Sequence, residues 1–349
     1  MDDTAAPQPQ NLQPFIVADE LIERDERDEG YEDGSDGSSL TSIASRIRSG
    51  VSENGRIYAA YGKAGEFSAR SLMCSEYGMP QDEKEADRID MAHEKYFLLL
   101  DRNRYLAPIK ENPQQILDLG TGTGIWSMDV ADAFPSAQVT GVDIAPIQPS
   151  WVPPNCRFEV DDVEASWTFK QDYFDYIFAR DLLFAIRDWP KLIRECYAHL
   201  KPGGWLELES IYGVLGCDDD TLPEDGSFRQ FDSLVQEAAI AFGTPLTDPD
   251  KYKGWLEAAG FETVVERKFK IPSNPWAKDK RLKMVGLFER ENFLGGLEGM
   301  SLRLFQKGLG WSPEETAILL AKVRSEIKNT RYHAYYPFYV VYGRKPQSV

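Results

Sequence analysis

Apolar and polar positions between residues 115 and 209 follow two alternating patterns. Short runs of mostly apolar residues predict β-strands, and longer runs with apolar residues at intervals of three and four predict helices. Strands separated by helices indicate an α/β domain in which helices cover both faces of a parallel sheet. The predicted strands are residues 115–119, 137–142, 157–160, 174–179 and 205–209, and the predicted helices are residues 124–134 and 189–200.

The last third of the chain has a different pattern, in which helices predominate. Gly260 is expected to end one of these helices just before a strand. The predicted helices are residues 228–242, 250–259, about 280–292 and about 312–328, and the predicted strands are residues 261–270 and 334–342.

The first 110 residues divide into three predicted segments. Residues 1–38 are polar, acidic and interrupted by glycine, and this composition predicts a disordered tail because it cannot offset the entropy of ordering. Residues 39–47 have the spacing of a short amphipathic helix and residues 82–100 that of a longer one, with an aromatic-rich segment between them. We expect residues 39–110 to form a helical lead-in that covers a main domain at residues 111–345.

Composition excludes other classes of protein. The 349 residues carry 57 acidic and 39 basic side chains, a net charge of −18, which would repel a phosphate backbone and makes nucleic-acid binding unexpected. No run approaches the ~20 apolar residues that span a bilayer, and the N-terminus lacks the basic and apolar regions of a secretory signal. The four cysteines form no CxxC pair, so we expect no disulfide scaffold, no metal site and a reducing, cytoplasmic location.

The most informative segment is the glycine-rich run Ile116-Leu-Asp-Leu-Gly-Thr-Gly-Thr-Gly-Ile-Trp126, between a predicted strand and a predicted helix. Gly120, Gly122 and Gly124 let the backbone turn sharply and let a ligand lie against it. Their spacing is GxGxG rather than the GxGxxG of a dinucleotide site. Asp118 would repel a pyrophosphate and would attract a ligand with a positive group. The pattern therefore favours S-adenosylmethionine, whose methionine end is zwitterionic, over the NAD of a dehydrogenase.

Two more predicted strand ends carry acidic residues. Asp143 ends the second strand, about 20 residues after the glycines, where a carboxylate can accept both hydroxyls of a ribose. Asp161 and Asp162 follow the third strand, where an acid can accept the amino group of adenine. Together with Asp118 these residues would lie at the carboxyl edge of the sheet, which is where open sheets bind ligands. Three acid-bearing strand ends in this order predict a nucleoside-binding site.

These motifs resemble those of the class I S-adenosylmethionine-dependent methyltransferases, and residues 201–207 are similar to the turn before the fifth strand of that superfamily. A closer resemblance, to the fungal LaeA-like methyltransferases, rests on residues 53–56, 87–90, 145–156 and 161–164. The resemblance covers roughly residues 40–345 and implies a Rossmann-like fold with a seven-stranded, mostly parallel sheet and helices on both faces. It also implies helical insertions on the acceptor side, at about residues 210–260 and 272–330.

The resemblance also implies roles for particular residues. Arg180 would line the floor of the site near the sulfonium, and Tyr58 would lie in the segment that covers the site. This chain departs from the family at Ala92-His93, where many relatives carry two adjacent histidines. The residues implied at the cofactor are Asp118, Gly120, Gly122 and Gly124 for the methionine part, Asp143 for the ribose, Asp162 and Val163 for the adenine, and Arg180 and Tyr58.

A catalytic residue is not assigned by the sequence. The methyl donor is already activated, so a general base is needed only when the acceptor must lose a proton. The candidates for such a base are His93, on the helix over the site, and His333, at the start of the last predicted strand. His199, at a helix end, is expected to be structural. The aromatic residues between 332 and 339 could wall an acceptor pocket, although alternation along a strand is also typical of plain core.

The sequence therefore predicts an enzyme that methylates an oxygen or nitrogen atom of a small fungal secondary metabolite, with S-adenosylmethionine as cofactor. The alternative is a LaeA-like nuclear regulator of metabolite gene clusters that acts in a protein complex, with the acidic tail as a partner-binding arm. No cluster of Lys and Arg resembles a nuclear-import signal, which favours the enzyme. The expected partner is a small-molecule acceptor, without nucleic acid or membrane.

Overall fold

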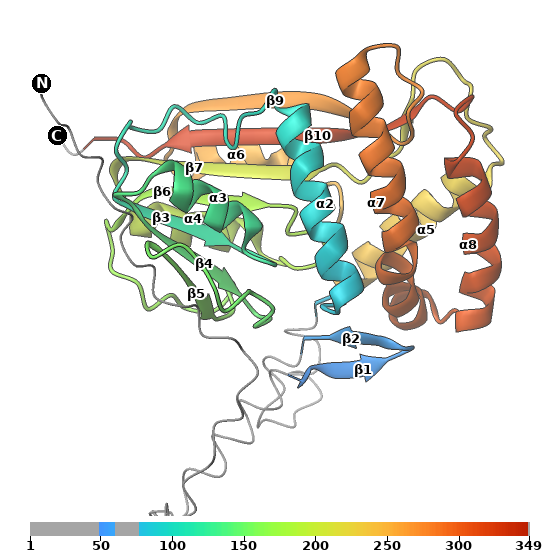
Figure 1. Ribbon diagram of the computed structural model, residues 1–349, viewed down its shortest axis with the longest axis horizontal. Helices are drawn as coiled ribbons and strands as arrows, with labels where there is room; N and C mark the ends of the chain where they lie inside the picture. Colours follow the sequence, from blue (N-terminus) through green and yellow to red (C-terminus); the bar gives the residue numbers. More distant parts are fainter. Residues whose placement is uncertain (1–48, 60–76, 348–349) are drawn as a thin grey trace, which may run out of the picture. The chain divides into compact units, whose positions relative to one another are not determined.

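The computed structural model describes residues 49–59 and 77–347, and a single twisted sheet lies at the centre of the domain that they form (Figure 1). The strands of this sheet are β3 (Gln115–Leu119), β4 (Gln138–Asp143), β5 (Cys156–Val160), β6 (Phe174–Arg180), β7 (Leu200–Ile211), β8 (Gly216–Cys217), β9 (Glu262–Pro272) and β10 (Ala334–Arg344). Their order is β5-β4-β3-β6-β7-β10-β8, and β9 pairs with β10.

The pairing of the strands confirms the mostly parallel α/β sheet. The five strands from β5 to β7 are parallel to their neighbours, whereas β10 is antiparallel to β7, β8 and β9. Among the described residues the central sheet has eight strands where seven were expected, and the additional one is β8, whose two residues are too few to give a hydrophobic pattern.

Apolar side chains pack on both faces of the sheet because successive side chains of a strand point to opposite faces. In β3, Ile116 belongs to the cluster on one face and Leu117 to the cluster on the other. The helices of the first face are α2 (Glu83–Leu99), α3 (Ile125–Ala133) and the first part of α7 (Lys280–Leu304), and those of the second are α4 (Trp189–His199) and α6 (Tyr252–Ala258). The expected helices on both faces are therefore confirmed.

A third apolar cluster joins the remaining helices to the start of β10. These helices are α5 (Ser227–Phe242), α8 (Pro313–Ile327) and the second part of α7, which continues into a π-helical turn at Phe305–Leu309. They group at one end of the sheet (Figure 1). A short 3-10 helix at Asp248–Lys251 precedes α6. No helix among the described residues combines the length and apolar character that crossing a bilayer requires.

Helix α7 runs to residue 304, well beyond the predicted end near residue 292, and the additional part contains Gly295, Gly296 and Gly299. Glycine in a helix interior usually lowers helix stability. At Gly296 a Cβ atom would lie 2.9 Å from Cδ of Arg88 in α2. The absence of a side chain thus allows α2 and α7 to pack closely, and this contact compensates for the lower propensity.

The aromatic-rich segment between the two helices predicted for the lead-in begins with a β-hairpin, which the hydrophobic pattern did not predict. Strands β1 (Val51–Glu53) and β2 (Arg56–Tyr58) pair in an antiparallel manner around Asn54 and Gly55, whose φ angles are 52° and 74°. Two positive φ angles at Asn-Gly are typical of a two-residue hairpin turn, a signal present in the sequence. The predicted tail at 1–38 and helix at 39–47 lie outside the described residues.

Helix α2 forms where the hydrophobic spacing predicts it. It begins after Asp82, whose side chain accepts a hydrogen bond from the backbone N–H of Glu85. The same carboxylate accepts two hydrogen bonds from the guanidinium of Arg56 in β2, at 2.6 and 2.8 Å. Asp82 therefore both caps α2 and fastens the hairpin to its N-terminus.

Candidate functional site

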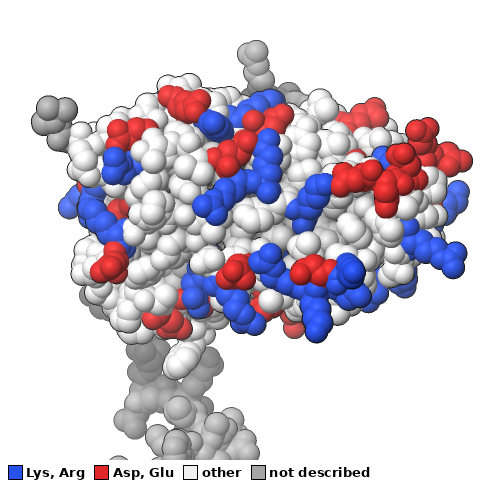
Figure 2. Space-filling model, turned by 90° about the horizontal axis from the view of Figure 1, so that it is seen from above, with Lys and Arg blue, Asp and Glu red and all other residues white. Residues whose placement is uncertain are grey.

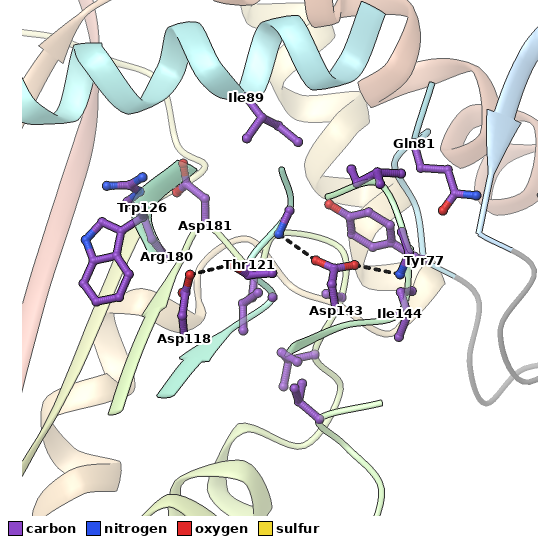
Figure 3. Close-up of a pocket in the computed structure, with 18 of the residues that line it drawn as sticks. Tyr77, Gln81, Ile89, Asp118, Thr121, Trp126, Asp143, Ile144, Arg180 and Asp181 are labelled. Carbon is purple, nitrogen blue, oxygen red and sulfur yellow. Dashed lines mark hydrogen bonds between the residues drawn. The ribbon is translucent and has the colours of Figure 1, made fainter. Parts of the chain in front are cut away.

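A cavity of about 170 Å³ opens where four parallel strands end (Figure 3). The residues that line it come from the carboxyl ends of β3, β4, β5 and β6 and from one side of α2. Strand β3 begins this part of the sheet, and the chain then runs outward to β4 and β5 before returning to β6 on the other side. Such a reversal of strand order leaves a crevice at the strand ends, where open α/β sheets bind ligands.

Asp118 lies at the base of this cavity with its carboxylate held in place by two hydroxyls. Its Oδ2 atom accepts hydrogen bonds from Thr121 Oγ1 and Ser127 Oγ, each at 2.7 Å. The residue is almost entirely buried, and this burial raises the pKa of its carboxyl to about 6. A buried carboxylate with an unfilled acceptor site is suited to bind a positively charged group.

Asp143 ends β4 and faces the same cavity (Figure 3). Its Oδ2 atom accepts a hydrogen bond from the backbone N–H of Gly122 at 2.8 Å, and its Oδ1 atom accepts one from Ala145 at 2.9 Å. Burial raises the pKa of this carboxyl to about 6. Each oxygen has accepted one hydrogen bond, so each retains capacity for a ligand hydroxyl.

The glycine-rich turn joins β3 to α3 and forms one wall of the cavity. Gly120 and Gly122 line it, with φ angles of 64° and 58° that favour glycine. At Gly120 a Cβ atom would lie 2.1 Å from Cδ2 of Leu182, so any side chain would collide with the loop after β6. A ligand can therefore lie directly against the main chain at Gly120 and Gly122, as the glycine spacing predicts.

Gly124 has a different role from the one expected of it. It does not line the cavity; it is the N-cap of α3, with a φ angle of 82°. A Cβ atom there would lie 2.2 Å from the Phe158 ring, which packs against it from β5. The placement of Gly124 at the methionine part of the cofactor is thus corrected to a packing role, because the turn has already left the cavity at this residue.

The acidic turn after β5 also reaches the cavity. Asp161, Asp162, Val163 and Glu164 are all among its lining residues. The turn is held by its own side chains, since the backbone N–H of Asp162 donates to Asp161 Oδ1 at 2.8 Å and that of Glu164 donates to Asp162 Oδ1 at 2.9 Å. The two predicted adenine residues, Asp162 and Val163, are therefore brought to the same cavity as Asp118 and Asp143.

Arg180 and His93 meet across the cavity from β6 and α2. Arg180 Nη2 donates to His93 Nδ1 at 3.0 Å, and Arg180 Nη1 lies 4.0 Å from Oε2 of the buried Glu209. The guanidinium carbon also lies 5.0 Å from the centroid of the Tyr96 ring. Arg180 and His93 both line the cavity.

Two other predicted residues lie elsewhere. Tyr58 is fully buried and does not line the cavity, because the guanidinium of Arg303 covers its ring, with Cζ 3.4 Å from the ring centroid. Its expected contact with the cofactor is therefore corrected to a structural contact between the hairpin and α7. His333 is also absent from the lining and pairs with Asp219, with 2.6 Å between Nδ1 and Oδ2.

The site includes residues that the sequence analysis did not single out. Helix α2 contributes Arg88, Ile89 and Tyr96, and the residue after β6 is Asp181. Burial raises the pKa of Tyr96 well above its ordinary value, so its hydroxyl stays protonated and donates to Asp181 Oδ2. Arg88 and Tyr96 are eight residues apart, a spacing that puts both on one side of a helix, and this was the available signal. Among the described residues, no group of His, Cys, Asp and Glu is arranged to hold a metal ion.

Comparison with known proteins relates the chain to methyltransferases. A family model described as a methyltransferase domain matches residues 91–266. The chain is 41% identical over 307 residues to "Methyltransferase pytC" of Aspergillus terreus, which covers 88% of this chain and 91% of the relative. It is 33% identical over 306 residues to "Secondary metabolism regulator LAE1" of Cochliobolus heterostrophus, which covers 86% of this chain and 96% of the relative.

A solved structure resembles the fold more distantly. Phosphoethanolamine N-methyltransferase 2 of Haemonchus contortus, solved with S-adenosyl-L-methionine, has a TM-score of 0.45 and 22% identity, and the match covers 73% of this chain and 53% of that one.

Proposed function

This chain belongs to the methyltransferase-domain family, and we propose that it methylates an oxygen or nitrogen atom of a small secondary metabolite of a fungus. It is an S-adenosyl-L-methionine-dependent methyltransferase. The observation that carries the proposal is the convergence of Asp118, Asp143 and Asp162 on one cavity beside a glycine-rich turn. The 41% identity to a protein named as a methyltransferase supports the same activity.

The residues around the cavity fit the parts of the cofactor. Asp118 offers a buried carboxylate for the ammonium, and Asp143 offers one free acceptor site on each oxygen for the ribose hydroxyls. Asp162 and Val163 stand where the adenine would lie. Arg180 was expected beside the sulfonium, but a guanidinium repels that cation, and charge places it better against the carboxylate of the methionine part.

The bound cofactor supplies a methyl group that is already activated by a sulfonium. The protein has to align the acceptor with that group and to exclude water. Helix α2 lies over the strand ends and lines the cavity with Ile89, Ala92 and His93. We propose that residues 77–99 act as the cover of the site and that residues 111–345 form the domain that holds the cofactor.

Calorimetry with purified protein tests this function directly. Titration with S-adenosyl-L-methionine should give one binding event per chain, and titration with NAD should give none. A dinucleotide that binds in place of S-adenosyl-L-methionine would overturn the proposal. Incubation of tritiated S-adenosyl-L-methionine with an extract of the producing fungus should then label a small organic-soluble product rather than protein.

A second candidate function rests on the 33% identity to a secondary metabolism regulator. In that case the chain would act in the nucleus through a protein complex, and the acidic residues 1–38 would be the partner-binding arm. Deletion of the gene separates the two candidates. Accumulation of one compound that lacks a methyl group supports the enzyme and a cytoplasmic location, whereas reduced transcripts from many gene clusters support the regulator.

Surface charge gives no support to a nucleic-acid ligand. On the face shown in Figure 2, Lys and Arg side chains are intermixed with Asp and Glu side chains over most of the surface. Nucleic-acid binding depends on a continuous basic patch that replaces counterions along the phosphates. This face therefore gives no support to a nucleic-acid acceptor.

A further inference from the structure

A second cavity, of about 90 Å³, lies beside the cofactor cavity. Four residues line both cavities: Tyr77, Arg88, Tyr96 and Asp181. Their side chains lie between the two spaces. An acceptor in the second cavity would therefore lie next to the place where the methyl group would be presented.

Aromatic side chains form the walls of the second cavity. Phe231 of α5, Phe293 of α7 and Tyr336 of β10 all line it, and the rings of Phe293 and Tyr336 stack with centroids 5.5 Å apart. The three residues belong to the third apolar cluster, outside the part of the sheet that lines the cofactor cavity. A flat, apolar body would gain favourable ring contacts and would leave water on entering this space.

One buried polar atom in this cavity has no hydrogen-bond partner. Glu289 lines the cavity and is fully buried. Its Oε2 atom accepts hydrogen bonds from Lys95 Nζ at 2.6 Å and Asn292 Nδ2 at 3.1 Å, whereas its Oε1 atom accepts none. An unsatisfied buried carboxylate oxygen is costly, and a ligand O–H or N–H group would satisfy it.

The charges around the cavity discriminate between classes of ligand. Its charged lining residues are Arg88, Asp181, Asp232 and Glu289. Arg88 is paired with Glu85, and Glu289 is paired with Lys95. The carboxylates of Asp181 and Asp232 remain, so the charge that a ligand would meet is negative. An anionic ligand would be repelled, and an uncharged one would not.

We propose that this second cavity binds the methyl acceptor, and that the acceptor is an uncharged, largely aromatic molecule with at least one hydrogen-bond donor. The donor on the atom to be methylated meets Asp181, which borders both cavities; its oxygens already accept hydrogen bonds from Tyr96 and from the backbone N–H of Ile211 but retain capacity for a third. A second donor on a larger acceptor would meet Glu289 Oε1. This inference rests on the proposed methyl transfer.

The test uses two probes that differ in one carboxylate: 2-naphthol and 6-hydroxy-2-naphthoate. Each is titrated by fluorescence at about pH 7.5 into protein saturated with S-adenosylhomocysteine. We expect 2-naphthol to bind at least about tenfold more tightly than the naphthoate. Equal affinity for the two probes would contradict the proposal that the cavity disfavours anions. Absence of 2-naphthol binding would contradict the proposal that the cavity binds an aromatic acceptor.

Two variants on the same helix locate the probe. Val235 of α5 lines the second cavity, so Val235→Phe should fill it and weaken naphthol binding at least about tenfold. Ile240→Phe is the matched control, because Ile240 lies on the exposed side of α5, and it should leave binding unchanged. Equal effects of both variants would contradict the assignment.

The charge argument has a variant of its own. Asp232→Asn keeps the shape of a lining residue and removes its charge. It should therefore reduce the difference in binding affinity between 2-naphthol and 6-hydroxy-2-naphthoate. Calorimetry with S-adenosyl-L-methionine is run on every variant and should give wild-type affinity. If the wild-type protein did not bind S-adenosyl-L-methionine, the proposed function would be contradicted. The naphthol titration would then test the second cavity separately.

Discussion

Arg180 Nη2 donates a hydrogen bond to His93 Nδ1 at 3.0 Å, and this contact determines the state of the histidine. A guanidinium can only donate, so Nδ1 must be the accepting, unprotonated nitrogen. The imidazole proton is then on Nε2, which lies 3.6 Å from Oδ2 of Asp129. With its one lone pair directed at Arg180, His93 has none for the proton of an acceptor. We infer that it positions Arg180.

We predict that His93→Ala lowers the affinity for S-adenosyl-L-methionine about three- to tenfold, because Arg180 loses a partner that holds it in the cavity. The pH dependence of kcat should keep its shape. Loss of a limb of that profile in the variant would instead identify His93 as a base. His333→Ala, which changes a residue outside the cavity, is the control and should alter neither quantity.

Replacement of Asp143 should weaken binding of the cofactor. Asp143→Ala removes two acceptor oxygens from the cavity and should weaken binding of S-adenosyl-L-methionine by at least about 1 kcal/mol, or roughly fivefold. Calorimetry measures the change. Asp132→Ala, at an exposed position in α3, should have no effect on affinity. An unchanged affinity in the Asp143 variant would show that the ribose is placed wrongly.

Affinity for the cofactor should depend on pH. Burial raises the pKa of Asp118 and of Asp143 to about 6, so both carboxylates are ionised above that pH and protonated below it. The ammonium and the ribose hydroxyls need the ionised forms. Calorimetry should therefore show affinity that is highest above about pH 7 and falls as the pH decreases towards 5. A flat profile would contradict the assigned roles.

Asp118 should reduce the stability of the cofactor-free protein at neutral pH. Its folded pKa lies above the unfolded value, so the folded state binds more protons between pH 4 and 6, and the stability deficit is complete above pH 6. Asp118→Asn keeps an acceptor for Thr121 and Ser127 and should raise the free energy of unfolding at pH 8 by about 1–3 kcal/mol. The gain should shrink towards pH 4 in urea denaturation, while affinity for the cofactor falls. An equal or larger gain at pH 4 would refute the charge explanation.

The packing role of Gly124 predicts a loss of stability. Gly124→Ala puts a Cβ atom into the Phe158 ring at a positive φ angle and should lower the free energy of unfolding by about 2 kcal/mol or more. Gly254→Ala, in α6, is the matched control, since no atom lies within 4 Å of the added Cβ and alanine favours a helix. It should be neutral or stabilising, and similar losses in both variants would contradict this account.

The sequence alone was sufficient for the cofactor cavity's main residues. Acidic residues stand at or just after the carboxyl ends of three predicted strands: Asp118, Asp143 and Asp162. In a parallel sheet these ends share one edge. The hydrophobic period of two placed Ile116 and Leu117 on opposite faces for the same local reason. These features depend on neighbours along the chain or on adjacent strands, so they could be derived from pattern and spacing.

Only the tertiary structure decided which helix faces meet. Tyr58 packs under Arg303, a residue more than 200 positions away, and nothing in the aromatic spacing of the lead-in identifies that partner. The second cavity likewise depends on how α2, α5, α7 and β10 pack together. Hydrophobic periodicity tells which side of a helix is buried but not what it is buried against, because many partners of similar shape satisfy the same pattern.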